Sequence, residues 1–102
     1  MSFFKNLFGG NQQLSEYLAQ GAVVIDVRTP GEFSGGHVKG SRNMPLSDIG
    51  NRVAEIKKLN KPVVLCCASG MRSGQATRLL KQQGIDCING GGWGKVAKAQ
   101  KG

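Results

Sequence analysis

Two short apolar runs constrain the fold of this chain more than any other feature. Residues 22–27 (AVVIDV) and residues 62–66 (PVVLC) are almost continuously apolar and rich in β-branched side chains. Runs of this kind are typical of strands that are buried on both faces of a parallel sheet. A third run, residues 85–88 (IDCI), predicts a further strand near the C-terminal end.

Segments with helical spacing lie before the first of these runs and between successive runs. Their apolar positions are Leu14, Tyr17 and Leu18, then Ile49, Val53 and Ile56, then Ala76, Leu79 and Leu80. Ser47 is the expected N-cap of the second helix, while Gly21 and Gly84 are expected to end the first and the third. Alternating strands and helices indicate βαβ units, and therefore an α/β fold with a parallel sheet and helices on both faces. The 102 residues have room for one domain, 1–102, with an N-terminal extension over 1–10.

The chain carries a formal charge of +8, from 14 Lys and Arg against 6 Asp and Glu. The basic residues are scattered without a nucleic-acid recognition motif, so we expect a solvated surface and no nucleic-acid partner. A basic field attracts small anionic substrates or acidic partners. Lys95, Lys98 and Lys101 are expected to lie in a solvated basic tail over residues 94–102.

The cysteines and the N-terminus suggest a cytoplasmic protein. Three cysteines and one histidine make neither an even disulfide framework nor a metal-ligand pattern, so we expect no metal and no cofactor. No segment resembles a signal peptide or reaches transmembrane length. The N-terminal Phe3, Phe4, Leu7 and Phe8 recur at helical spacing and are expected to cap the core, with a membrane surface as the alternative.

Cys67 is the candidate reactive residue. It follows the second apolar run directly, so it lies at the carboxyl end of its strand, where ligands bind in open α/β sheets. The loop after it turns into a helix, and converging backbone N–H groups at such a turn favour a negative charge. We therefore expect a thiolate held by the loop residues Ala68, Ser69, Gly70, Met71, Arg72 and Ser73.

Four segments of the chain resemble the rhodanese-like domain family, in the order that the family shows. They are VIDVR at 24–28 with Glu32 and Phe33, GHVKGS at 36–41 with NMP at 43–45, CASGMRS at 67–73, and Gly84 with NGG at 89–91. Their order and their secondary-structure context make the resemblance specific. It implies a central five-stranded parallel sheet flanked by helices.

The resemblance also implies an activity, sulfur transfer of the thiosulfate:cyanide type. Cys67 would be the catalytic nucleophile and would carry the transferred sulfur as a persulfide, while residues 68–73 would bind the donor. The substrates implied are a small anionic sulfur donor such as thiosulfate, and cyanide or a thiol as acceptor. A protein could also serve as donor or acceptor, and the chain is expected to be a monomer.

Other functions compete with turnover of small molecules. The same loop would suit a persulfide carrier that docks a protein partner, or a redox sensor in which Cys67 forms a disulfide. Related Cys-dependent phosphatases and arsenate reductases are less favoured, because only four residues separate Cys67 from Arg72 here and a tighter cradle suits a single sulfur atom. Cys66 points to the opposite face of its strand, so Cys66 and Cys87 are expected in the core.

Several polar residues near the predicted site are expected to support it. Arg72 either holds the anionic donor or braces the loop against a carboxylate, and Ser73 either caps the helix or bonds the persulfide. Asp26 is expected to bond turn N–H groups and Arg28 to pair with Glu32. His37 is expected to be hydrogen-bonded structure. Trp93 either shields an edge of the core or forms an apolar wall of the pocket.

Overall fold

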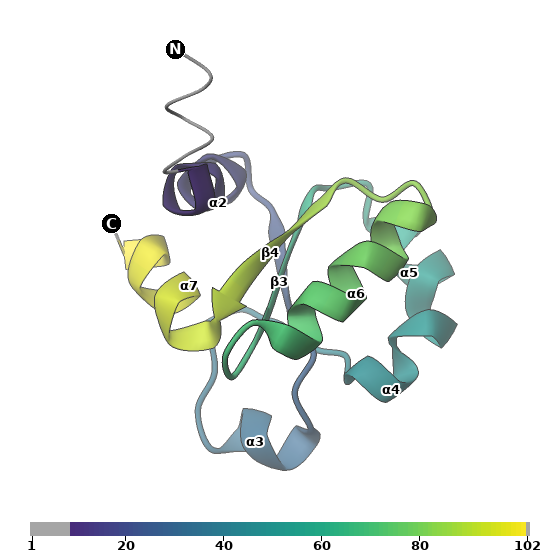
Figure 1. Ribbon diagram of the computed structural model, residues 1–102, viewed down its shortest axis with the longest axis horizontal. Helices are drawn as coiled ribbons and strands as arrows, with labels where there is room; N and C mark the ends of the chain where they lie inside the picture. The colour runs from purple at the N-terminus through teal and green to yellow at the C-terminus, as the bar shows by residue number, and fades with distance from the viewer. Residues whose placement is uncertain (1–8, 102) are drawn as a thin grey trace.

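The computed structural model describes residues 9–101, which alternate between helices and strands (Figure 1). In chain order the elements are α2 (Gly9–Ala19), β1 (Val23–Asp26), α3 (Pro30–Ser34), β2 (Arg42–Asn43), α4 (Leu46–Ile49), the 3-10 turn η1 (Gly50–Arg52), α5 (Val53–Leu59), β3 (Val63–Cys67), α6 (Met71–Gln82), β4 (Cys87–Gly92) and α7 (Trp93–Lys101). The expected cap formed by Phe3, Phe4, Leu7 and Phe8 lies outside the described residues.

All the strands of the sheet run parallel, in the order β2-β1-β3-β4. The described residues therefore form four strands, which corrects the five that the family resemblance implied. At one edge, β2 is only two residues long. The remaining described segments are helices or connections and do not pair with the sheet as a further strand. The α/β class and the parallel sheet are confirmed.

The sheet buries side chains on both of its faces. Residues that alternate along β1 and β3 pack against α4, α5 and α6 on one face and against α2 and α7 on the other (Figure 1). The first cluster contains Ile25, Leu65, Cys67, Ile56 and Leu80, and the second contains Val24, Val64, Cys66, Leu14 and Val96. Every side chain of β3 is buried, as the continuous apolar run predicted.

The element boundaries differ from the predictions at two places. Ser47 lies inside α4 rather than at its N-cap, because Pro45 precedes the helix and fixes its start. The last strand starts at Cys87 and continues through Gly92, where the sequence predicted residues 85–88. Glycine is disfavoured in strands, but here a side chain would not fit, since a Cβ on Gly90 would lie 2.7 Å from Val64 Cγ1.

We expect Gly90→Ala to lower the free energy of unfolding by about 1–3 kcal/mol, the usual cost of overpacking a core. The added methyl would also lie 2.8 Å from Val96 Cγ2, so both the sheet and α7 would have to move. Gly94→Ala is the matched control, because a Cβ there meets nothing within 4 Å and the residue is helical. Urea unfolding of both variants tests this, and equal stabilities would contradict it.

The segment expected to be a basic tail is a packed helix. α7 buries Val96 completely against α2 and the sheet, whereas Lys95, Lys98 and Lys101 are exposed. The charge pattern predicted the solvated lysines, but it gave no sign of the apolar face formed by Val96 with Trp93, Ala97 and Ala99, which packs the helix on the core. Among residues 9–101, every helix is too short or too polar to form a membrane span.

Candidate active site

Cys67 is the last residue of β3, and a three-residue turn connects it to α6 (Figure 1). Gly70 makes the turn possible, because its φ of 101° lies in the left-handed region that favours glycine. The turn folds the chain back over the thiol, so that Cys67 is only 1% exposed. The predicted position of Cys67 at the carboxyl end of a parallel strand is thus confirmed.

Three hydrogen bonds end on the Cys67 sulfur. The N–H groups of Gly70 and Ser73 donate to Sγ over 3.0 and 3.4 Å, and the Ser73 hydroxyl lies 3.3 Å from it. The thiol is therefore buried, but among donors rather than among apolar side chains alone. Donors at this distance stabilise a negative charge on sulfur more than they stabilise a neutral thiol.

The balance of burial and hydrogen bonding favours the thiolate. Burial alone would raise the pKa of the Cys67 thiol, but bonds from the Ser73 hydroxyl and from the N–H groups of Ser73, Gly70 and Ser69 outweigh it and lower the pKa. Burial, with the charge of Asp26, raises the pKa of Cys66 to about 12, and burial also raises that of Cys87. Cys67 alone among the three is prepared to react as a thiolate.

We expect Cys67 to be alkylated selectively as the pH rises. Because its pKa is lowered, half of the maximal rate with iodoacetamide should be reached below about pH 8.5, the usual value for a free cysteine. Cys66 and Cys87 should stay unmodified until the protein unfolds. Mass spectrometry of the three cysteine peptides measures this, with protein in urea as the control. A Cys67 profile matching that of the unfolded chain would contradict the expectation.

Arg72 is paired with Glu32, the carboxylate that the sequence predicted as the partner of Arg28. Its guanidinium binds Glu32 through two bonds, Nη1 to Oε1 at 2.7 Å and Nη2 to Oε2 at 3.0 Å. Arg72, with Thr29 N–H, lowers the pKa of Glu32 to about 2. Glu32 also completes the capping box of α3 with Thr29, so the pair ties α3 to the start of α6. The bracing role foreseen for Arg72 is present.

The outer rim of the loop is exposed. Ala68 and Ser69 face solvent, and Met71 is 77% exposed although it is a large apolar residue. Of the loop residues predicted from the sequence, Gly70 and Ser73 point their N–H groups at the sulfur, whereas the side chains of Ala68, Ser69 and Met71 lie outside. A partner that reaches Cys67 has to approach past this rim.

Asn89 is a residue of the site that sequence reasoning did not single out. Its side chain makes three hydrogen bonds near the loop. Asn89 Oδ1 accepts from the Ser73 hydroxyl at 2.7 Å and from Gly91 N–H at 3.0 Å, and Nδ2 donates to Gly70 O at 3.0 Å. It comes from β4, which is far from Cys67 in sequence. The available signal was a polar residue directly before Gly90 and Gly91, at the end of a predicted strand.

Asp26 and Arg28 form a buried ion pair behind the site. Arg28 binds the Asp26 carboxylate through Nε at 3.0 Å and Nη2 at 2.7 Å, and Nη2 also donates to Gly36 O at 2.7 Å. The expected ion pair of Arg28 with Glu32 was wrong, because the Glu32 carboxylate binds Arg72 instead. The contact of Arg28 with Glu32 is a bond to the backbone carbonyl, at 3.4 Å. Asp26 does accept a turn N–H, that of Arg28, at 2.9 Å.

Two aromatic contacts complete the surroundings. Trp93 packs against the core on the α2 and α7 face, and Arg28 lies over its ring at 4.8 Å from the centroid. Trp93 thus shields the core edge, as one of the two expectations had it. His37 donates from Nδ1 to Phe33 O at 2.7 Å and stacks on the Phe33 ring, so its expected structural role is confirmed.

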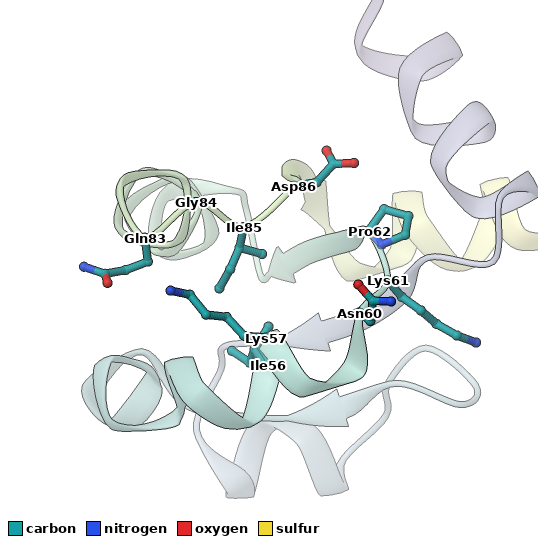
Figure 2. Close-up of a pocket in the computed structure, with 9 residues that line it drawn as sticks. All are labelled: Ile56, Lys57, Asn60, Lys61, Pro62, Gln83, Gly84, Ile85 and Asp86. Atoms are coloured by element: carbon teal, nitrogen blue, oxygen red, sulfur yellow. The ribbon is translucent and has the colours of Figure 1, made fainter.

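A surface hollow of about 520 Å³ lies at the other end of the sheet (Figure 2). Its walls include Lys57, Pro62 and Asp86, which precede β3 or β4, whereas Cys67 ends β3. Apolar side chains such as Ile56 and Ile85 line the hollow together with polar ones, and in Figure 2 the polar groups of Lys61 and Asp86 point away from it. Within residues 9–101, no cluster of His, Cys, Asp and Glu suits a metal ion.

Comparisons with known proteins agree with this geometry. Residues 10–99 match the family model described as "Rhodanese-like domain". The chain is 46% identical to the uncharacterized protein YqhL of Bacillus subtilis over 78% of its length and 67% of that protein, and 36% identical to thiosulfate sulfurtransferase PspE of Escherichia coli over 72% of each.

Solved structures show the same fold. The reduced CoADR-RHD of Bacillus anthracis superposes with a TM-score of 0.72 and 31% identity over 88% of this chain, which spans only 16% of that longer chain. The family match, these relatives and the arrangement around Cys67 lead to one conclusion: the chain belongs to the rhodanese-like domain family and is homologous to thiosulfate sulfurtransferases.

Proposed function

We propose that this protein is a sulfurtransferase that moves a sulfane sulfur from thiosulfate, or a similar anionic donor, to cyanide or a thiol through a persulfide on Cys67. The observation that supports it best is the set of three hydrogen bonds that end on Cys67 Sγ. A sulfur held in this way can be a nucleophile in one half of the reaction and a leaving group in the other.

In the first step the Cys67 thiolate attacks the outer sulfur of thiosulfate. A bond forms between the two sulfurs, the bond inside thiosulfate breaks, and sulfite leaves with the electron pair. In the second step cyanide attacks the outer sulfur of the persulfide. The disulfur bond breaks, thiocyanate leaves, and the electron pair returns to Cys67 Sγ. No oxidant or reductant is consumed, since each step exchanges one nucleophile for another at the same sulfur.

The loop would bind the donor with its backbone rather than with a free arginine. Arg72 is engaged by Glu32 through two bonds, so most of its charge is already compensated. The N–H groups of Gly70 and Ser73 point into the turn and would stabilise the sulfur charge that develops in each step. Ala68, Ser69 and Met71 would border the entering donor, which is the binding role proposed for residues 68–73.

The test is to supply thiosulfate and cyanide and to measure thiocyanate as its coloured iron complex. In parallel, protein treated with thiosulfate alone should gain one sulfur atom on the Cys67 peptide, seen by mass spectrometry, and should lose it when cyanide is added. Thiocyanate formation without sulfur on Cys67 would contradict the mechanism. Absence of both would contradict the proposed function.

A second candidate is a persulfide carrier that receives sulfur from a protein. The observation favouring it is the rim: Cys67 is 1% exposed, whereas the neighbouring Met71 is 77% exposed and offers an apolar contact to a docking protein. Protein isolated from cells would then already carry sulfur on Cys67, while turnover of thiosulfate would be slow. A redox sensor is less favoured, because Cys66 lies in the cluster on the opposite face of the sheet, and Cys87, although it shares the cluster of Cys67, is buried with its thiol bonded to Thr77 O at 3.6 Å.

A further inference from the structure

The Ser73 hydroxyl lies between two acceptors. It is 2.7 Å from Asn89 Oδ1 and 3.3 Å from Cys67 Sγ, and Ser73 is completely buried. A serine hydroxyl carries a single proton, so it can make only one full hydrogen bond as a donor. The shorter distance places that proton on the side of Asn89 when the sulfur is neutral.

The orientation of the Asn89 amide is fixed by two partners that have only one possible role. Gly91 N–H must donate, so the atom 3.0 Å from it is the amide oxygen. Gly70 O must accept, so the atom 3.0 Å from it is the amide nitrogen. Because the oxygen therefore faces Ser73, Asn89 can only accept from that hydroxyl and never donate to it.

We propose that Asn89 is a positioning residue that holds the Ser73 proton away from the Cys67 sulfur until that sulfur carries a negative charge. The hydroxyl then turns from Asn89 Oδ1 to Sγ and stabilises the thiolate. Two acceptors competing for one donor make this a switch, because a charged sulfur is a stronger acceptor than an amide oxygen, whereas a neutral thiol or a persulfide is a weaker one.

The switch would operate twice in the reaction proposed above, and to that extent it rests on the proposed function. When the thiolate attacks a donor, the inner sulfur becomes neutral and the hydroxyl returns to Asn89. When the persulfide bond breaks, the electron pair moves to Cys67 Sγ and the hydroxyl turns back to it. The leaving sulfur thus gains a hydrogen bond as its charge appears, which is where such a bond accelerates a reaction.

Other charged and titratable groups near the sulfur do not compete for this proton. Arg72 on α6 is bound to Glu32 on α3, and Cys66 lies in the core cluster on the opposite face. Cys87 on β4 shares the cluster of Cys67, but its thiol donates to Thr77 O at 3.6 Å. The Lys95 side chain on α7 lies over Gly91, and its ammonium is 3.9 Å from the position that a Cβ on Gly91 would occupy. These groups would change the Cys67 pKa by the same amount whether or not Asn89 is present.

The test is a double-mutant cycle that reads the Cys67 thiol itself and requires no sulfur transfer. The pH dependence of iodoacetamide alkylation at Cys67 is measured in the wild type, Asn89→Ala, Ser73→Ala and the double variant. Removing Asn89 loosens the loop in both backgrounds, so that contribution cancels. In the background that keeps Ser73, Asn89→Ala should also free the Ser73 hydroxyl to bond Cys67 Sγ. The ionised fraction of Cys67 should therefore rise about 3- to 10-fold more in that background than in the Ser73→Ala background.

Equal effects of Asn89→Ala in the two backgrounds would overturn the proposal, because Asn89 would then act only on the backbone of the loop. An opposite sign would overturn it as well. Asn89→Asp is the second variant, since it keeps the shape and an acceptor oxygen. Its charge should slow alkylation in both backgrounds, and more strongly where Ser73 can be held by the carboxylate. A protein that shows this coupling but forms no thiocyanate would sink the proposed function and leave this inference standing.

Discussion

Replacing Cys67 with serine should abolish thiocyanate formation, reducing the rate by a factor on the order of 10⁴ or more, as expected when the nucleophile of a covalent mechanism is removed. A serine hydroxyl stays protonated under the hydrogen bonds that ionise a thiol, and an oxygen cannot carry the sulfane sulfur as a persulfide. The smaller oxygen fits the same space beneath Gly70 and Ser73 N–H, so the loop should remain folded. Initial rates of thiocyanate formation measure the loss.

Cys66→Ala is the matched control for this experiment. It changes the neighbouring residue of the same strand, but that side chain is buried in the core cluster formed with α2 and α7. The variant should keep sulfur transfer while losing some stability, because a small buried group is removed. Comparable activity in Cys67→Ser and wild type would show that another group carries the sulfur. Comparable loss in both variants would show a failure of packing instead.

The sheet and the position of Cys67 were predictable because their signals are local. A strand buried on both faces reads as a continuous apolar run, and parallel strands separated by helices leave few possible topologies. If residues 62–66 form such a strand, Cys67 must lie at its carboxyl end. The structure confirms this, and it also confirms that Cys66 and Cys67 face opposite sides of the sheet.

The partners of the charged residues could not be predicted in the same way. The sequence offers Glu32 as a neighbour of Arg28, but Arg72, which is 40 residues away in the chain, binds that carboxylate. Asn89 likewise meets Ser73 only because β4 lies beside β3. Spacing within one element says little about which side chain from another element arrives there, so such pairs depend on the assembled fold.

The glycine-rich end of β4 shows a different limit. Residues 90–92 are all glycine, and this run predicts a turn because glycine weakens a strand and lacks a side chain to pack. The structure pairs Gly91 and Gly92 with Cys66 and Cys67 across a register shift, and a Cβ on Gly92 would lie 2.9 Å from Ala68 O. Close approach of the loop that follows Cys67 requires glycine here, a need that only the tertiary contact reveals.

Asp26→Asn should lower the free energy of unfolding by about 3–5 kcal/mol, the usual cost of removing one partner from a buried ion pair. Asp26 is 0% exposed and Arg28 is 4% exposed, so the guanidinium would keep its charge with little solvent to compensate it. The neutral amide retains the shape of the carboxylate, and the loss would therefore report charge rather than packing. Urea unfolding followed by circular dichroism measures it.

Two controls separate the charge from other causes. The double variant Asp26→Asn with Arg28→Met removes both charges and should recover part of the stability, because no ion is then buried without a partner. Glu55→Gln breaks the exposed pair with Arg52 and should cost far less, since solvent screens both groups. If Asp26→Asn cost no more than Glu55→Gln, the Arg28 charge would have to be compensated without Asp26. Its remaining contacts, Gly36 O, Glu32 O and the Trp93 ring, would then have to compensate that charge.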